Sequence, residues 1–254
     1  MTETDIPTRP SGKRLARKSL VRAARSEGED YTLAVVLASV AGAANAGGFF
    51  AVAQYTSHMT GYLSLLADNL AIAHFWVAFV SAVAILAFIA GAGFSAILIN
   101  WARAHHSHHQ YALPIAVQGG FLACFSLGWI FTSEAGRVFS ISCLCFIMGM
   151  QNATITKLSG ARIRTTHATG MVTDIGIELG RAVYGLLRPG ADVRADRRKL
   201  GILFSLVGAF LGGGIVGALG YKGLGFLFSL PLAAVLLAIS VPHLLIAKPD
   251  PSEP

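Results

Sequence analysis

The chain has 254 residues, of which 54% are hydrophobic and 13% are charged, and it carries a net charge of +7. Soluble globular domains carry about 25% charged residues, so this composition excludes an ordinary water-soluble domain. It favours a membrane protein whose helices are surrounded by lipid.

The chain begins with a basic tail, residues 1–30, which holds seven Lys and Arg side chains. We expect this tail to be disordered and cytoplasmic, where its positive charges orient the first membrane span. No aromatic residue is interleaved with these charges, so nucleic-acid binding is not expected. A second short tail, residues 249–254, is also expected in the cytoplasm.

Six apolar segments are long enough to cross the hydrocarbon core, which takes about 20 residues as a helix. These segments lack the strict alternation of a transmembrane β-strand, which excludes a barrel. The sequence therefore predicts an all-α, polytopic membrane protein. The predicted spans are residues 31–53, 75–99, 113–133, 138–156, 200–221 and 223–247.

A short motif, His-x-Thr-Gly, occurs twice, at residues 58–61 and 167–170. Each copy follows an Asn-Ala pair, the first at 45–46 and the second at 152–153. The Asn residues are 107 positions apart and the His residues 109. This register predicts an internal duplication.

The two motifs open segments of intermediate polarity, residues 56–74 and 157–187. We expect short helical or re-entrant segments there, and not further spans. With six spans and a cytoplasmic N-terminus, the external loops hold only Arg137 and Lys222. That distribution agrees with the enrichment of Lys and Arg in cytoplasmic loops, so both termini are expected inside.

Six spans give three to each half of the duplication, residues 31–137 and 138–248. Because three is odd, the second half enters the membrane in the opposite direction from the first. The sequence thus predicts two inverted three-helix repeats. Inverted repeats are common in secondary transporters, where the substrate lies at the repeat interface.

Two spans contain small and amide residues among apolar ones, at 42–48 and 148–152. Glycine permits local unwinding, and transporters use such breaks to aim freed backbone groups at a solute. Alternatively, small residues only bring helices close together, and amides bond across the contact. Asn45, Gln151 and Asn152 together favour a polar site.

In each motif the Thr, Thr60 or Thr169, is expected to cap the helix that follows. His58 and His167 then stand just ahead of two helix N-termini, where a proton can be exchanged near neutral pH. Plain interfacial histidines are the alternative. The motif glycines, Gly61 and Gly170, complete the two sets.

The second copy also carries charged residues. Arg164 precedes the motif, where it is expected to attract an anion or to hold Glu178. Asp174 and Glu178 are four residues apart and share one helix face, and Arg181 is placed to pair with Glu178. A coupling site or a salt-bridged surface helix would each explain this pattern.

These motifs resemble those of the YoaK family (domain of unknown function 1275), small bacterial integral membrane proteins. The resemblance rests on four runs and extends from about Tyr31 to Lys248. It implies a six-span inner-membrane protein described as a permease, with no established substrate. The family usually has an acid where Asn45 stands and Asn where Tyr62 stands, so this chain departs from it at two places. The four runs are residues 42–50, 57–61, 148–153 and 164–170.

Together these features predict an inner-membrane transporter or permease of a small polar or ionic solute. The alternative is a non-transporting scaffold or sensor that recruits a cytoplasmic partner. No nucleophile motif or metal helix is found, so an enzyme, a cofactor and a metal are not expected. The lipid bilayer is the expected partner, and homo-oligomerisation stays open.

Overall fold

The computed structural model describes residues 27–52, 54–105, 109–130, 133–158, 168–188, 190 and 192–246. This part of the chain is helical and contains no strand, as the apolar composition predicts. Two short 3-10 segments, η2 and η3, adjoin the α-helices. The elements are α1 (Glu27–Val52), α2 (Met59–Ala71), α3 (Phe75–His105), α4 (Ala112–Phe125), η2 (Ser126–Ile130), α5 (Glu134–Leu158), α6 (Ala168–Leu187), α7 (Arg197–Leu224), η3 (Gly225–Phe228) and α8 (Ser229–Ile246).

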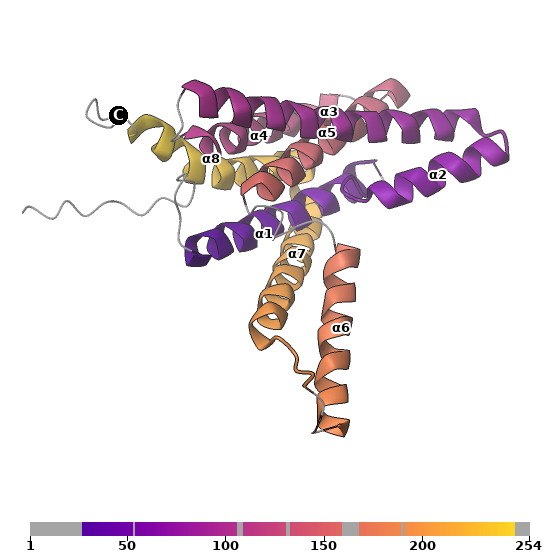
Figure 1. The fold of residues 1–254 in the computed structure, drawn as a ribbon. Coiled ribbons are helices and arrows are strands. Elements are labelled where there is room, and N and C mark those ends of the chain that lie inside the picture. The colour runs from indigo at the N-terminus through magenta and orange to yellow at the C-terminus, as the bar shows by residue number, and fades with distance from the viewer. Residues whose placement is uncertain are drawn as a thin grey trace, which may run out of the picture.

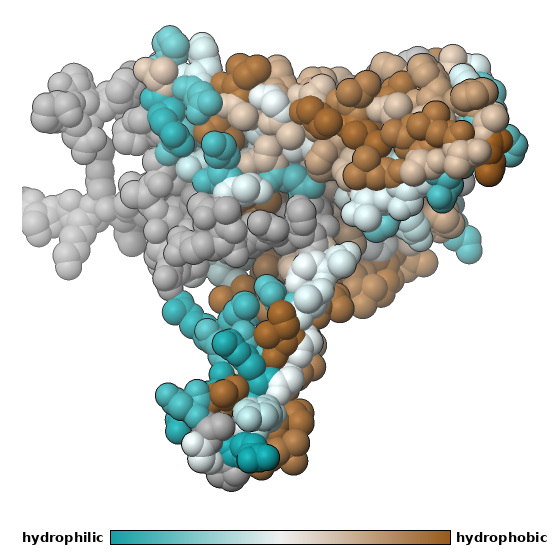
Figure 2. All heavy atoms as spheres, turned by 45° about the vertical axis from the view of Figure 1, so that its right-hand side comes forward, coloured by the Kyte–Doolittle hydropathy of each residue, from teal (hydrophilic) through white to brown (hydrophobic). Residues whose placement is uncertain are grey.

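Five stretches of these helices are long and apolar enough to cross a membrane, and the last, Arg197–Leu245, contains both α7 and α8. The intermediate segments form separate helices, α2 and α6, as expected. Large apolar side chains remain exposed along the spans, for example Leu86, Ile89 and Ile97 on α3. Brown, apolar surface accordingly covers much of the face in Figure 2, which is what a multi-pass membrane protein presents to lipid.

Two helical hairpins project from a common body (Figure 1). In one, α2 lies beside the first part of α3, and in the other, α6 lies beside α7. The body contains α1, α4, α5 and α8, with α4 packed along α8. The most extensive contacts join helices from different halves of the chain, α1 with α7 and α3 with α5.

Glycines bring the backbones of α1 and α7 into contact. A Cβ at Gly42 would overlap the carbonyl oxygen of Phe210, and a Cβ at Gly213 would overlap that of Ser39. Further along, Gly217 lies against Ala43 in the same way. Residue numbers rise together along both helices, so α1 and α7 run parallel.

The contact between α3 and α5 repeats this arrangement. A Cβ at Gly149 would overlap the carbonyl oxygen of Phe88, and a Cβ at Gly91 would overlap that of Phe146. Gly149 stands 107 positions after Gly42, and Gly91 stands 122 positions before Gly213 on α7. The same offsets relate the opposing carbonyls, so both contacts are made by corresponding residues.

The helix α1 is continuous through residues 42–48, where unwinding was one of two expectations. The chain leaves the helix only after Val52, and α2 starts at Met59. Packing explains the difference, because these glycines are where α7 approaches and an intact helix serves that contact best. Gly47 accordingly lies against the ring of Tyr221.

Candidate functional site

A chain of amide hydrogen bonds crosses the centre of the body. Gln151, on α5, donates through Nε2 to the backbone carbonyl of Leu37 on α1, at 2.6 Å. Its Oε1 accepts from Nε2 of Gln118 on α4, at 3.1 Å. Both glutamine side chains are buried, with 1% of their surface exposed. The predicted site residue Gln151 therefore joins three helices, two of them from the other half.

Asn45 serves a different contact. Its Oδ1 accepts from the backbone N–H of Ser57 at 3.1 Å and from the Ser57 hydroxyl at 3.0 Å. These bonds hold the turn between α1 and α2 against the side of α1. The neighbouring Thr56 is fully buried, and no described residue bonds to its hydroxyl. Asn152, the counterpart of Asn45, is half-buried on α5.

The first His-x-Thr-Gly motif forms the start of α2. His58 is the N-cap, and its carbonyl accepts from the N–H groups of Gly61 and Tyr62 at 3.0 and 3.3 Å. The prediction that Thr60 caps this helix is wrong, because Thr60 is its second residue. Gly61 lets the His58 ring fold back, since a Cβ there would overlap the ring. His58 thus stands at the helix terminus, as expected.

The second motif is described only from its third residue. Arg164 and His167 lie outside the described residues. Thr169 and Gly170 are exposed in the first turn of α6, and the Thr169 carbonyl accepts from the Thr173 hydroxyl at 2.9 Å. This placement matches the first motif, where the Thr-Gly pair also falls inside the helix.

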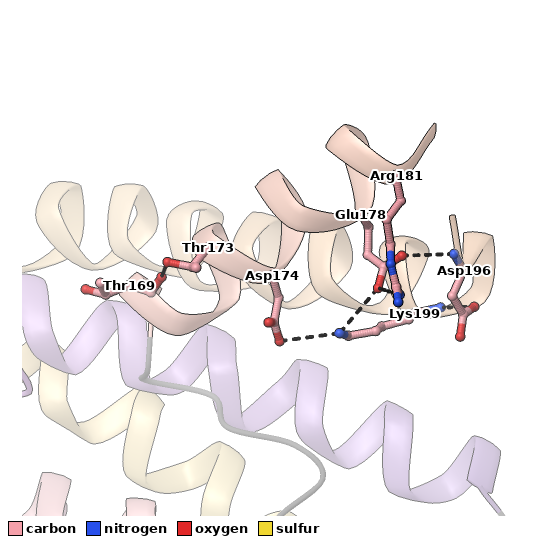
Figure 3. Close-up of polar contacts among 7 residues, drawn as sticks. All are labelled: Thr169, Thr173, Asp174, Glu178, Arg181, Asp196 and Lys199. Atoms are coloured by element: carbon pink, nitrogen blue, oxygen red, sulfur yellow. Dashed lines mark hydrogen bonds and ion pairs between the residues drawn. The ribbon is translucent and has the colours of Figure 1, made fainter. Parts of the chain in front are cut away.

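The acids of α6 face α7 (Figure 3). Lys199 Nζ lies 3.7 Å from Asp174 Oδ2 and 3.4 Å from Glu178 Oε1, so both acids share one helix face. Arg181 pairs with Glu178 at 3.4 Å, as the spacing predicted. Glu178 Oε2 also accepts the backbone N–H of Asp196 at 3.0 Å, and Asp196 Oδ1 caps α7 by accepting the Lys199 N–H.

These contacts change the acidity of Glu178. The N–H of Asp196 contributes most to holding the pKa of the Glu178 carboxyl below its usual value, followed by Lys199 and Arg181, while desolvation opposes them. The side chain is only 1% exposed, and the groups that bond to it contribute to covering it. Glu178 is therefore charged and ties α6 to α7.

Three buried polar residues of the body were not predicted from the sequence, namely Gln118, Ser95 and Thr154. Gln118 is an amide within an apolar span, the same signal that singled out Asn45, and could have been found. About one turn after Gln151 on α5, Thr154 shares a buried hydrogen bond of 2.8 Å with Ser95 on α3. Hydroxyls recur throughout the apolar spans, so no sequence signal distinguished this pair.

Comparison with known families identifies the family of this chain. Neither the curated proteins nor the solved structures contain a match to it. Residues 33–241 match the family described as "Protein of unknown function (DUF1275)", which includes all the predicted spans in whole or in part. The chain therefore belongs to the DUF1275 family, as its motifs suggested.

Proposed function

We propose that this protein is an inner-membrane transporter, or permease, of a small polar or ionic solute. It consists of two inverted three-helix repeats with six spans and cytoplasmic termini. The observation that carries the proposal is the repeated glycine contact, α1 on α7 and α3 on α5, made by corresponding residues of the two halves. Repeated halves are common in secondary transporters, where alternating access moves one repeat or bundle against the other.

The direction of the helices agrees with the six-span arrangement, and eight spans would require the same direction. With three spans in each half, α1 is the first span and α7 the fifth, so both must cross in the same direction. The order of their contacts, Ser39 with Gly213 and Ala43 with Gly217, is parallel as this requires. In the proposed six-span arrangement the helices α2 and α6 do not cross the membrane.

The solute would lie where polar groups of the two halves meet. Gln151 contributes its amide there, close to the backbone of α1. Asn45 and Asn152, at corresponding positions, would line the same region. The helix starts after the two motifs would flank it, shaped by His58, Thr60, Gly61, His167, Thr169 and Gly170. Arg164 would attract an anion or hold Glu178, and Asp174, Glu178 and Arg181 would couple α6 to α7 during the cycle.

Flux measurements in liposomes test this proposal. The full chain would be reconstituted, and internal pH and membrane potential followed while pools of small metabolites and ions are offered. We expect a flux that His58→Ala/His167→Ala abolishes and that Gln151→Leu lowers about tenfold, the effect of losing one hydrogen bond of about 1.4 kcal/mol. His74→Ala, an exposed histidine between α2 and α3, is the matched control.

A folded protein that carries no solute in any pool would overturn the proposal. The alternative would then take its place, a scaffold or sensor whose glycine contacts serve packing alone. The charged α6–α7 hairpin, which projects from the body in Figure 1, would be the part to test for a cytoplasmic partner.

A further inference from the structure

Gln118 stands apart from the other buried polar groups of the body. It lies on α4 between the buried residues Ile115 and Leu122, and 1% of its own surface is exposed. Its Oε1 has no hydrogen-bond partner anywhere in the described part of the chain. Burying an amide oxygen without a partner costs about 1 to 3 kcal/mol, so this atom needs an explanation.

The amide chain fixes which atom of Gln118 is left over. The carbonyl of Leu37 can only accept, so the nitrogen of Gln151 must face it. The oxygen of Gln151 then faces Gln118 and requires a donor, which is the Gln118 nitrogen. Turning either amide over would set two acceptors or two donors against each other. The unpaired atom is therefore an acceptor.

An unpaired acceptor selects its ligand by the charge of the ligand and by the hydrogen-bond donors that the ligand carries. It repels an anion and binds a group with N–H or O–H donors, most strongly a charged one. A metal ion is less suitable, because a single amide oxygen supplies only one of the several ligands that such ions require. An ammonium or protonated amine needs only one acceptor at this point.

Gln118 also lies next to the junction of the two halves. The runs Leu113-Pro114 on α4 and Leu230-Pro231 on α8 are 117 positions apart, and the same offset pairs Gly119 with Leu236. A Cβ at Gly119 would lie 3.3 Å from the Cβ of Leu236. Corresponding residues touch each other only where a twofold axis passes, so Gln118 is one residue from the axis relating the repeats.

We infer that Gln118 selects the solute, and that the solute is an ammonium or protonated amine which donates an N–H to its Oε1. The inference rests on the proposed transport function and names its substrate class. The corresponding position on α8 is Val235, so only one half supplies this acceptor. The site is thus a single one, and not a symmetric pair.

Binding can be tested separately from transport. The full chain in detergent would be titrated with methylammonium, and its thermal stability followed, because a ligand that binds the folded state raises the melting temperature. Tetramethylammonium, a cation without N–H, and acetate would be titrated at equal ionic strength. We expect methylammonium alone to stabilise the protein.

Single substitutions test whether Gln118 is the residue that binds methylammonium. Gln118→Leu is expected to weaken methylammonium binding tenfold or more, about the effect of losing a hydrogen bond to a charged group. The control is Gln110→Leu, which removes a glutamine that accepts a hydrogen bond from Arg103 near the end of α3. This variant should bind methylammonium as the wild type does.

Several outcomes would overturn the inference. These are an equal response to tetramethylammonium, preference for acetate, no response to methylammonium as expected if a water molecule occupies the acceptor, or unchanged binding by a folded Gln118→Leu protein. If liposomes carry an anion instead, transport stands and the substrate class fails. If methylammonium binds through Gln118 but nothing is carried, the substrate class stands as a binding property and transport fails.

Discussion

Glu178 shows how one side chain can hold a whole hairpin. It accepts the Asp196 N–H and pairs with Lys199 and Arg181, so several of the bonds around the α6–α7 junction converge on this carboxylate. The pKa of the Glu178 carboxyl is lower in the folded hairpin than in the unfolded chain. The contact therefore stabilises the hairpin at pH values above the ordinary pKa of a carboxyl. The stabilisation is lost as pH falls through the folded pKa.

This linkage predicts an acid-sensitive hairpin. Spin labels at Leu186 and Arg197 are expected to show a narrow distance distribution at pH 7, which broadens in acid, once the pH falls below the ordinary pKa range of a carboxyl and Glu178 is protonated. Glu178→Gln should broaden it at every pH and remove the pH dependence. Asp174→Asn, whose pair with Lys199 is half-exposed, should change little. A narrow distribution in Glu178→Gln at pH 7 would refute the assignment.

At this scale the sequence predicted well wherever partners are close along the chain. The Glu178–Arg181 pair follows from helix periodicity, and so does the shared face of Asp174 and Glu178. Lys199 and the Leu37 carbonyl could not be predicted, because they come from helices whose packing depends on the fold. Thr60 was misassigned because His58 takes the cap, two residues earlier than the hydroxyl rule implies.

At the scale of helices, four glycines decide which elements pair. Each lies opposite a carbonyl of the partner helix, so even a methyl group has no room. Local periodicity could place the helices, since a span of about 20 apolar residues has few alternatives in lipid. It could not identify which helices pack together, because contacting residues such as Gly42 and Phe210 are far apart in the sequence.

Alanine at these glycines is expected to be destabilising in both contacts. Gly42→Ala and Gly149→Ala should each cost about 1 to 3 kcal/mol, because overpacking forces the backbones apart. Gly93→Ala and Gly120→Ala are matched controls with open space around a Cβ, and should be neutral or slightly stabilising. Unfolding in one detergent compares all four. Equal stability of Gly42→Ala and Gly93→Ala would contradict the packing.

For the molecule as a whole, orientation in the membrane distinguishes six spans from eight. If α2 and α6 do not cross, the loop between α4 and α5 is external and the end of α3 is cytoplasmic. If both crossed, these two assignments would be exchanged. Lipid exposure cannot decide between them, because α2 and α6 both present large apolar side chains, such as Leu63 and Val183.

Labelling in intact cells tests the orientation. In a cysteine-free background, Glu134→Cys is expected to react with a membrane-impermeant maleimide, and Ala104→Cys only after the membrane is opened. Both positions are exposed, so access depends on the side of the membrane alone. Reaction of Ala104→Cys but not Glu134→Cys in intact cells would show that α2 crosses the membrane and would overturn the six-span topology.

The glycine contacts also set an order in time. Apart from neighbours along the chain, α1 finds its main partner only in α7, more than 140 residues after the end of α1. During synthesis α1 must therefore wait in the bilayer with its glycine face covered by lipid. The contact between α3 and α5 can form as soon as α5 is made, so the contact between α1 and α7 closes last and completes the packing of the first half.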